Sequence, residues 1–439
     1  MYSEENIRKR KEAAEKKYEE VLKKSLKEVR FTDYSFTNYK GELRWMEESS
    51  DNNLEIMKGG VGIDGSSVGL MSADLSDVLL FPDLDTLRTF KSFDEKVNLF
   101  LCRVFDQKGD PHLMDPRQIL QKVVDKGLSM GYTVDMFSEL EFFIRDLATG
   151  EPVDKGNYVS VPPMDQCLNF RRELAHAMED AGIEVKRLHH ECGPSQHEIE
   201  LKLQPVMRNC DNTIMGWWLA DNIARKYKWY VDKEPKPWNN LAGSGLHQHI
   251  LLRNAKDGSN AMLKTGEDGG LSDIGLQFVA GLIKYSSEIV SVFAQSHQSF
   301  LRLKPGHEAP TYTYWGYCSR NAVIRIPAVS KDIKEWTRCE YRAGDASGSP
   351  HLMCAMIYAA GLKGIEEKLV CPKAFEGTMD QLREDKDKET KYGATLLPKS
   401  NEECKKILEN GTLVKEVLGE PMRLLLAKLQ NKIAVASSK

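Results

Sequence analysis

The chain has 439 residues, 29% of them charged and 41% hydrophobic, with a formal net charge of −4 at pH 7. This length is sufficient for more than one domain, and the composition is that of an ordinary globular protein. The slight negative charge excludes a general electrostatic attraction to nucleic acid or to an anionic membrane surface.

The N-terminal segment, the apolar runs and the cysteines indicate where the protein works. Residues 4–28 are rich in charge, with apolar side chains at roughly helical spacing, and predict an amphipathic helix rather than a secretory signal. No apolar run approaches the length of a membrane span, and the longest, residues 352–362, is interpreted as a buried helix. Nine cysteines without a CxxC pair indicate free thiols in a reducing compartment. We therefore expect a cytoplasmic protein with a helical leader over residues 1–28.

Residues 29–112 predict a small β domain. Runs rich in aromatic and β-branched residues are typical of strands, and they occupy residues 29–36, 43–48 and 98–106. Residues 59–83 between them are rich in glycine and serine and are expected to form loop or edge structure. There Asp64 heads an Asp-Gly-Ser-Ser turn, and Asp77 precedes an apolar, strand-like run. An aspartate at such a turn usually caps its own backbone.

A larger domain is expected over residues 113–439, and it opens with a helix. Asp115 and Pro116 suit the N-cap and the first position of a helix that runs to about Gly127. Strand-like segments then alternate with helices without regular βαβ units, which favours an antiparallel sheet with helices outside it. Strands are expected within residues 133–146, 182–193, 195–205 and 241–252. Helices are expected over 170–180, 209–226, 271–296, 350–367 and, in two pieces, 401–429, whereas 377–395 is weakly patterned.

The expected strands carry charged side chains two residues apart, which places each set on one face of its strand. The sets are Glu139 with Glu141, His189 with Glu191, His247 with His249, and Arg338 with Glu340 and Arg342, and Glu198 lies one short strand beyond Glu191. One such set alone is typical of a solvated surface strand with salt bridges. Together they predict a curved sheet whose concave face gathers five carboxylates and one or two histidines.

Carboxylates gathered in this way predict a metal site. Two unit charges about 4 Å apart repel by on the order of 4 kcal/mol at an effective dielectric constant near 20. Divalent cations are the usual compensation, and oxygen ligands with one imidazole suit Mg²⁺ or Mn²⁺ better than zinc. Such ions beside several arginines favour phosphoryl transfer. The motif GxxxxGK[ST] is absent, so a nucleotide would not lie on a P-loop.

An ordered set of motifs extends from about Val29 to the C-terminus. The motifs include IDGSSVG, ELEFF, HHE followed by QHEIE, GSGLHQH, RLKPGHEAP, RNAVIRIP and RCEYR. With them the chain resembles the glutamine synthetase family, of the class I type found in bacteria and archaea. The resemblance implies an α+β fold with a small N-terminal β-grasp domain and a larger catalytic domain, whose curved antiparallel sheet is flanked by helices. It also implies a homo-oligomer, expected as two stacked hexameric rings with active sites between subunits.

The same resemblance implies a reaction in two steps. ATP phosphorylates the γ-carboxylate of glutamate, and ammonia then attacks the acyl phosphate. Two ions, Mg²⁺ or Mn²⁺, are expected at each site. By matching motif positions, one ion would be held by Glu141, Glu191 and Glu198, and the other by Glu139, His247 and Glu340.

Other roles also follow from matching motif positions. Arg302 and Arg342 are expected to bind the α-carboxylate of glutamate, and the backbone of Gly243 its amino group. His249 is expected toward the nucleotide. Arg320 and Arg338 would neutralise phosphate, with Arg325 assisting, and Arg320 is also expected to be catalytic. The role in each case is to stabilise charge on the transferring phosphoryl oxygens.

Two acidic residues are expected to act in the second step. Glu308 matches a flap glutamate that closes over the site, keeps water from the acyl phosphate and takes a proton from the incoming ammonium. Asp64 of a neighbouring subunit would bind and deprotonate ammonium, with support from Asp77. Both expectations come from the resemblance.

Departures from the family pattern leave the amine substrate open. The family's Asn-Gly-Ser-Gly begins with Ala242 here, its Asn-Ser-Tyr-Lys-Arg reads Gln-Ser-Phe-Leu-Arg over residues 298–302, and Asn-Pro-Tyr becomes Ser-Pro-His over residues 349–351. A smaller side chain at residue 242 could make room for a larger amine. The first hypothesis is therefore a glutamate–ammonia ligase, the second a ligase that joins glutamate to a polyamine or alkylamine, and the third a relative without activity.

Overall fold

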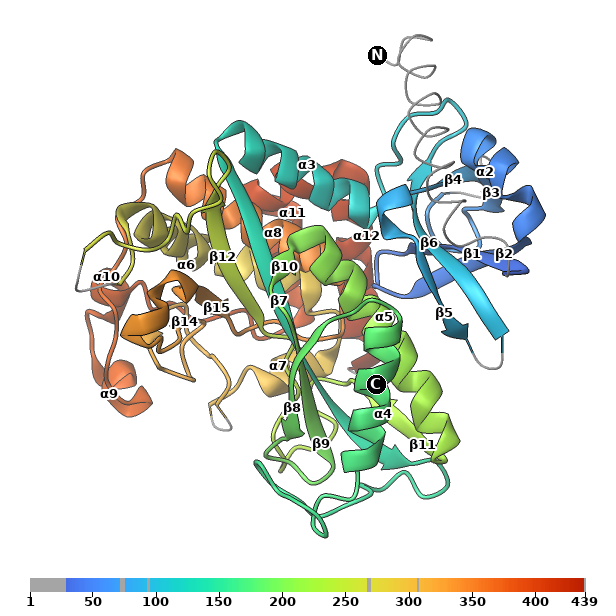
Figure 1. The fold of residues 1–439 in the computed structure, drawn as a ribbon. Helices are drawn as coiled ribbons and strands as arrows, with labels where there is room; N and C mark the ends of the chain where they lie inside the picture. The colour runs from blue at the N-terminus through green and yellow to red at the C-terminus, as the bar shows by residue number, and fades with distance from the viewer. Residues whose placement is uncertain (1–28, 72–75, 93–94, 267–269, 306–307, 438–439) are drawn as a thin grey trace. The chain divides into compact units, whose positions relative to one another are not determined.

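The computed structural model describes residues 29–71, 76–92, 95–266, 270–305 and 308–437 (Figure 1). The leader helix expected over residues 1–28 lies outside the described residues. The chain divides into two compact units. The smaller unit comprises residues 1–118 with 176–183, and the larger one comprises residues 119–175 with 184–439.

The smaller unit is built on a six-stranded sheet. Its strands, in spatial order, are β2 (Leu43–Ser49), β1 (Phe31–Thr37), β6 (Glu95–Phe105), β4 (Asp77–Pro82) and β3 (Val61–Asp64), with β5 (Arg88–Ser92) also pairing with β6. Only β1 and β6 run parallel among these pairs. A short helix, α2 (Asn53–Gly59), precedes β3. The three predicted strands are present, and the segment expected as loop or edge structure supplies β3 and β4.

The larger unit contains a nine-stranded sheet. Its spatial order is β13 (Trp315–Tyr317), β14 (Ile324–Ile326), β15 (Cys339–Tyr341), β12 (Gln248–Asn254), β7 (Tyr132–Asp146), β9 (Gln196–Leu201) and β8 (Val185–His190). Two short strands, β10 (Gln204–Pro205) and β11 (Trp229–Asp232), also pair with β7. The expectation of an antiparallel sheet is wrong for one pair, because β13 and β14 run parallel. The remaining pairs are antiparallel, and β7 is the longest strand, so it spans most of the sheet.

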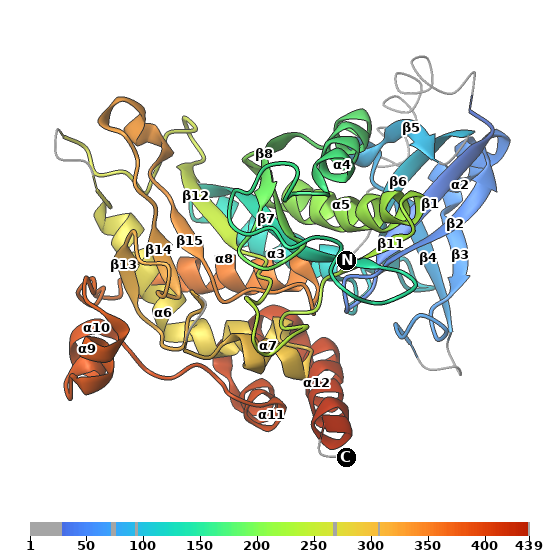
Figure 2. The same cartoon turned by 90° about the horizontal axis from the view of Figure 1, so that it is seen from below.

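Helices pack against this sheet. Those longer than eight residues are α3 (Pro116–Ser129), α4 (Leu168–Asp180), α5 (Val206–Lys226), α6 (Asp273–Phe293), α8 (Pro350–Glu366), α11 (Asn401–Asn410) and α12 (Thr412–Ser437). Shorter ones are α7 (His297–Arg302), α9 (Met379–Glu384) and α10 (Lys388–Tyr392), the last two in the weakly patterned segment. Figure 2 shows α6, α7, α11 and α12 gathered on one side of β7 and β12. Asp115 caps α3 as predicted, since its Oδ1 accepts the Arg117 amide at 2.9 Å.

The helix α6 is longer and more apolar than the apolar runs of the sequence predicted. By length and composition it is apolar enough to cross a membrane, although no run was expected to approach that length. Its most apolar stretch is 72% buried within the fold, and the helix packs closely on α8. A long, apolar helix buried in this way is a core element of the larger unit. All nine cysteines lie within the described residues and are free thiols, as expected.

Candidate active site

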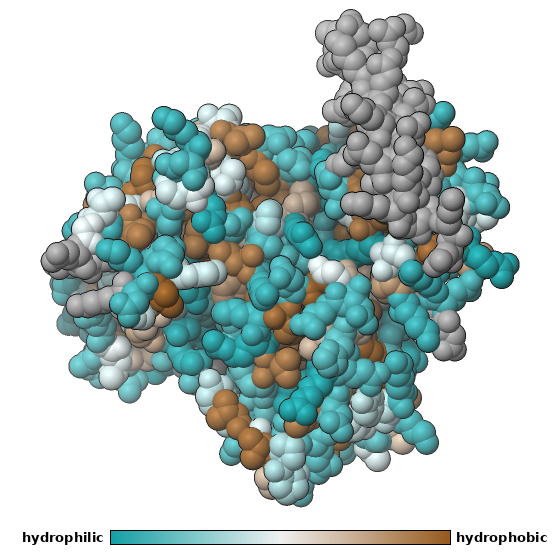
Figure 3. Space-filling model, viewed as in Figure 1, coloured by the Kyte–Doolittle hydropathy of each residue, from teal (hydrophilic) through white to brown (hydrophobic). Residues whose placement is uncertain are grey.

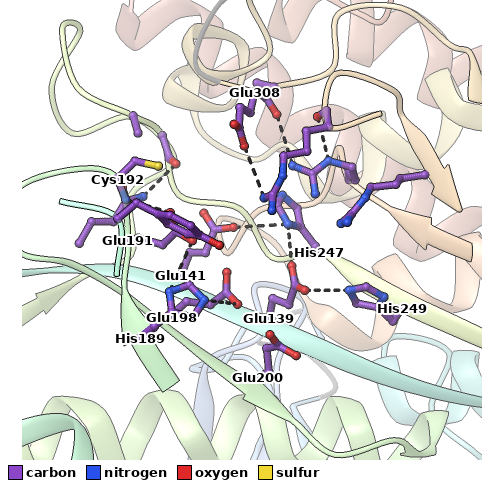
Figure 4. Close-up of a pocket in the computed structure, with 18 of the residues that line it drawn as sticks. Glu139, Glu141, His189, Glu191, Cys192, Glu198, Glu200, His247, His249 and Glu308 are labelled. Carbon is purple, nitrogen blue, oxygen red and sulfur yellow. Dashed lines mark hydrogen bonds and ion pairs between the residues drawn. The ribbon is translucent and has the colours of Figure 1, made fainter. Parts of the chain in front are cut away.

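A cavity of about 470 Å³ opens on one face of the sheet in the larger unit (Figure 4). Thirteen of the residues that the motif positions assign to the site line it: Glu139, Glu141, Glu191, Glu198, Gly243, His247, His249, Arg302, Glu308, Arg320, Arg325, Arg338 and Arg342. Glu340 is fully buried behind the lining, within ligand distance of Glu139 and His249. The larger unit therefore brings the expected carboxylates, imidazoles and guanidinium groups together.

Strand register explains why these side chains converge. β7 pairs with β9 so that Glu141 lies opposite Glu198. On its other edge β7 pairs with β12, and β12 pairs with β15 so that His249 lies opposite Glu340. Directly opposed residues of an antiparallel pair have Cβ atoms about 5 Å apart, so each pairing places two functional groups in contact range. The spacing of two residues within each strand then keeps all of them on the cavity face.

Glu139 is the centre of the histidine contacts. Its Oε1 lies 2.7 Å from Nε2 of His249, and its Oε2 lies 2.9 Å from Nδ1 of His247. Burial alone would raise the pKa of Glu139, but the two imidazoles hold it well below its usual value. Nε of Arg338 donates to Nδ1 of His249 at 3.0 Å, so the proton of that imidazole is on Nε2 and points at Glu139.

The opposite end of the cavity has an excess of carboxylates. His189 lies 3.4 Å from Oε1 of Glu198 and 3.7 Å from Oε1 of Glu191. Burial, with the nearby Glu141 carboxylate, raises the pKa of Glu191 to about 7. Burial and the surrounding carboxylates also raise the pKa of Glu198 well above its usual value. Such groups favour a bound proton or a bound cation over the bare charge.

These donors fit a hard divalent ion. Among the described residues of the cavity, four groups have ligand atoms within 4.8 Å of one another, namely Glu139 with Glu141 and His247, His189 with Glu191 and Glu198, Glu139 with His249 and Glu340, and Glu139 with Glu198 and Glu200. Carboxylate oxygens with a single imidazole suit Mg²⁺ or Mn²⁺. The raised pKa values of Glu191 and Glu198 are consistent with a cation site, because a bound cation would replace the protons that these carboxylates otherwise favour. The groups divide the carboxylates differently from the two sets that the motif positions suggest.

Arginines neutralise the carboxylate charge at the buried end of this face. Nη1 of Arg325 donates to Oε2 of Glu340 at 2.8 Å, and Nη1 of Arg342 donates to its Oε1. Burial alone would raise the pKa of Glu340, but Arg342 and the nearby His249 hold it below its usual value. Glu340 is therefore a paired carboxylate, in contrast to Glu191 and Glu198.

Arg302 is a buried residue of the cavity lining and is anchored to the main chain. Its Nη1 donates to the Ala343 carbonyl at 2.8 Å, and its Nη2 donates to the Arg342 carbonyl at 2.9 Å. Nη2 also lies 3.3 Å from Nε2 of His247. The Arg302 side chain packs closely on Gly243. A Cβ added at Gly243 would come within 2.8 Å of the Arg302 Cγ and 2.6 Å of the Pro235 carbonyl oxygen. Only glycine therefore fits at residue 243.

Glu308 and Arg320 face each other at the mouth of the cavity. Nη1 of Arg320 lies 3.5 Å from Oε2 of Glu308, and both side chains are about half exposed. Glu308 adopts a φ of +58°, a left-handed conformation that is uncommon outside glycine, and it directly follows two residues outside the described part of the chain. Nη2 of Arg342 donates to the Glu308 carbonyl at 3.4 Å.

Comparison with known proteins identifies the family. Residues 28–107 match the family model described as the beta-Grasp domain of glutamine synthetase, and residues 113–429 match the one described as its catalytic domain. The chain belongs to the glutamine synthetase family. A glutamine synthetase of Thermotoga maritima is 33% identical over 411 residues, which cover 91% of this chain and 92% of that protein. One of Thermococcus kodakarensis is 34% identical over 395 residues, which cover 89% and 86%.

Solved structures agree with this assignment at the level of the fold. A cryo-EM structure of Plasmodium falciparum glutamine synthetase superposes with a TM-score of 0.86 at 21% identity, covering 96% of both chains. A structure described as apo GmaS without ligand gives a TM-score of 0.84 at 23% identity, covering 94% of both chains. The expected β-grasp domain and larger catalytic domain are confirmed, and the chain is a ligase of the glutamine synthetase family.

The cavity of this glutamine synthetase family member also has lining residues for which the sequence predicted no role. They include Tyr158, Lys186, Arg187, Cys192, Gln196 and Glu200. Glu200 continues the spacing of Glu198 along β9, so the same period could have assigned it. It accepts from Lys186 at 2.6 Å and from Arg187 at 2.9 Å. Tyr158 lies in the irregular chain between β7 and α4, where no spacing pattern marks it.

Asp64 and Asp77 lie in the smaller unit and are not among the residues that line the cavity. They face each other across the β3–β4 pair. The hydroxyl groups of Ser67 and Ser66 donate to Asp64 and lower its pKa to about 2. This glutamine synthetase family member therefore carries an exposed, ionised Asp64 at neutral pH, and its part in a site stays a prediction.

Proposed function

We propose that this ligase forms glutamine from glutamate and ammonia, with ATP as co-substrate, through a γ-glutamyl phosphate intermediate in the cytoplasm. One observation carries the proposal. A single cavity joins an end with an excess of carboxylates, at Glu191 and Glu198, to an end with several arginines, at Arg325, Arg338 and Arg342. The first end suits divalent cations and the second suits anionic phosphate and carboxylate groups.

The metal ligands are proposed from motif positions and from their place in the cavity. Glu141, Glu191 and Glu198 would hold one Mg²⁺ or Mn²⁺, and Glu139, His247 and Glu340 another, giving two or more ions at each site. When bound, these ions would neutralise phosphate charge and orient the γ-phosphate of ATP. His249 is held by Arg338 and Glu139 at its two nitrogens, which fixes its ring, and it would lie toward the nucleotide.

Glutamate would bind at the Arg302 and Gly243 side of the cavity. Arg302 would hold the α-carboxylate with Arg342 beside it, because both line the cavity and each carries a planar fork of donors. The Gly243 main chain would receive the amino group. The γ-carboxylate would then point toward the metal ligands, where phosphoryl transfer occurs.

The transferring phosphoryl group would be stabilised by Arg320, Arg325 and Arg338. Their positive charge would lie near the equatorial oxygens, where negative charge spreads in the transition state. Arg320 is the exposed member and already contacts Glu308. Movement of the Glu308 segment would therefore also reposition Arg320.

Amide formation would use Glu308 and Asp64. Glu308 would cover the acyl phosphate and accept a proton as ammonia attacks. Asp64, from a neighbouring subunit and supported by Asp77, would bind ammonium, and its low pKa keeps it anionic for that role. This arrangement requires a homo-oligomer, which we propose as two stacked hexameric rings.

The proposal is tested with purified protein, glutamate, ATP, Mg²⁺ and ammonium. Phosphate release and the amide product, measured by mass spectrometry, should rise together in a ratio of one to one. Reactions without ammonium or without glutamate are the controls. Phosphate release that stays at the level of these controls would reject the proposed activity.

A second candidate is a ligase of the same family that joins glutamate to an organic amine, such as a polyamine or alkylamine. The observation that favours it is Ala242, a small side chain that lines the cavity next to Gly243. An amine panel at fixed ATP and glutamate decides between the two. If ammonium gives the highest kcat/KM, the organic amine candidate is wrong, and if an alkylamine does, the ammonia ligase is wrong.

A further inference from the structure

Asp154 is a buried carboxylate that does not line the cavity, although Glu191 and Gln196, which follow its partners His190 and Ser195 in the sequence, do. It lies in the chain between β7 and α4, and its side chain is fully buried. Oδ1 accepts hydrogen bonds from the amides of Gly156 and Ser195 and from Nε2 of His190, and Oδ2 accepts from the Gln166 amide. The donors therefore come from three separate segments.

The first connection runs through His190 to Glu191. Nε2 of His190 lies 3.0 Å from Asp154, and Nδ1 of the same ring lies 2.7 Å from the carbonyl of Glu191. The Glu191 amide in turn donates to the Gln196 carbonyl at 2.7 Å. Both backbone groups of Glu191 are thus held, so its carboxylate leaves the main chain at a fixed point beside the cavity.

The second connection runs through Ser195 to the loop that carries Gly243. The Ser195 amide donates to Asp154, and the Asp154 amide donates back to the Ser195 hydroxyl at 2.6 Å. Ser195 has a φ of +54°, a left-handed backbone conformation that is unfavourable for a residue other than glycine. The next residue, Gln196, donates from its side-chain Nε2 to the Gly243 carbonyl at 3.0 Å.

The third connection fixes the loop that carries Tyr158. Hydrogen bonds from Gly156 and Gln166 to Asp154 join both ends of this loop to one carboxylate. The Val159 amide also donates to the His190 carbonyl at 3.0 Å. Tyr158 lies between these attachments, lines the cavity and contacts the ring of His189 edge-on, with ring centres 5.6 Å apart.

A metal ion is the alternative explanation for this cluster, because Asp154, His190 and His197 have ligand atoms within 4.8 Å of one another. Arg171 argues against it. Its Nη1 lies 2.7 Å from Nδ1 of His197, and a guanidinium can only donate, so Nδ1 is the acceptor and the ring proton is on Nε2. A protonated Nε2 has no lone pair for a metal. The cluster is therefore a hydrogen-bonded network rather than a cation site.

We propose that Asp154 is a positioning residue that sets Glu191, Gly243 and the Tyr158 loop relative to one another. The inference rests on the proposed function, because Glu191 matters as a ligand of the metal ions that the reaction needs. Asp154 touches none of the reacting groups. It acts through His190 on the metal ligand and through Ser195 and Gln196 on the glutamate side.

The test compares two buried Asp–His pairs in the full-length protein. Asp211 and His351 form a pair of the same kind, 2.9 Å apart and buried, that lies away from the cavity lining. Asp154→Asn should weaken Mn²⁺ binding, measured without substrates by the EPR signal of free Mn²⁺, by about 10-fold or more. Asp211→Asn should change this affinity less than about 2-fold, although both substitutions lower the unfolding temperature.

Equal Mn²⁺ affinity in Asp154→Asn and Asp211→Asn, with both variants folded by circular dichroism, would overturn the inference. If Asp154→Asn does not fold, His190→Asn decides instead. Its amide keeps a donor near the position of Nδ1 and removes the one that reaches Asp154, so unchanged Mn²⁺ affinity there also overturns the inference. A protein that binds Mn²⁺ as expected but makes no amide contradicts the proposed function alone, whereas absence of Mn²⁺ binding by the unsubstituted protein contradicts both.

Discussion

Glu340 and Glu198 are both buried carboxylates on the same face of the sheet, but their neighbours differ in sign. Glu340 is paired with Arg325 and Arg342. Glu198 has the carboxylates of Glu139 and Glu141 close by, and its pKa is raised. Removal of charge should therefore have opposite effects on stability at the two positions, even though both are proposed metal ligands.

Glu340→Gln should lower the free energy of unfolding by about 3 kcal/mol, because it leaves the buried Arg342 and the partly buried Arg325 without their counter-charge. Glu198→Gln should leave the stability of the metal-free protein unchanged or raise it, since it relieves repulsion among carboxylates. Both variants should lose amide formation. Denaturant unfolding in EDTA at about pH 7.5 measures the difference, and equal destabilisation of the two variants would contradict these charge assignments.

The raised pKa of Glu191 predicts how the free energy of unfolding depends on pH. Its pKa is about 7 in the folded, metal-free protein against 4.5 in the unfolded chain, so the folded state binds more protons between these values. Stability must then fall as pH rises through this window, by about 3 kcal/mol from this group. The unfolding temperature in EDTA should decrease from about pH 5 to pH 8, and Mn²⁺ should raise it more at the higher pH. Glu191→Gln is the control, and an equally steep decrease in that variant would show that another group is responsible.

At the scale of elements, the spacing of side chains along the strands predicts much of the site. The same spacing does not predict the positions of loops or the register between strands. The period of two in β7, β9, β12 and β15 places the carboxylates and imidazoles on one face, as the structure confirms. Which strand lies beside which depends on long-range pairing, so the contact between Glu139 and His249 could not be derived from either strand alone. Tyr158 and Asp154 lie in irregular chain, where position is set by tertiary hydrogen bonds and no periodic pattern marks a residue.

Helix packing is also set by long-range contacts that a local sequence pattern does not predict. The helices α6 and α8, for example, approach each other closely at glycines. A Cβ added at Gly281 would come within 2.1 Å of the Ala360 carbonyl. Gly281→Ala should therefore force the helices apart and destabilise the protein by about 1–3 kcal/mol. Gly59→Ala in α2, where an added Cβ has open space, should be neutral or stabilising by up to about 1 kcal/mol. Thermal unfolding of the two variants checks this, and a neutral Gly281→Ala would contradict the close contact.

At the scale of the whole molecule, the chain combines a β-grasp unit with a catalytic unit, as other members of the family do. The motif resemblance predicts this architecture and the family, which the comparisons confirm. The cavity is built within the catalytic unit, whereas Asp64 belongs to the β-grasp unit. In the proposed arrangement, the cavity of one subunit and Asp64 of a neighbouring subunit form one active site.

Mixing inactive variants tests that arrangement. Asp64→Ala and Glu198→Gln each should be inactive alone. When the two chains are co-expressed in equal amounts, about a quarter of the sites at head-to-tail interfaces should combine an intact catalytic face with an intact Asp64 of the next subunit. Amide formation should then recover to about a quarter of the unsubstituted level. No recovery in assemblies shown by mass spectrometry to contain both chains would indicate that Asp64 does not act across an interface.

The central claim is that ATP phosphorylates the γ-carboxylate of glutamate before the amine attacks. Glutamate labelled with ¹⁸O in that carboxylate tests it directly, because the oxygen that bridges carbon and phosphorus in the acyl phosphate leaves with the phosphate. Mass spectrometry of the phosphate released with ATP, Mg²⁺ and ammonium should show one ¹⁸O atom for each amide formed. Phosphate without the label, released at the same rate as the amide, would contradict the account.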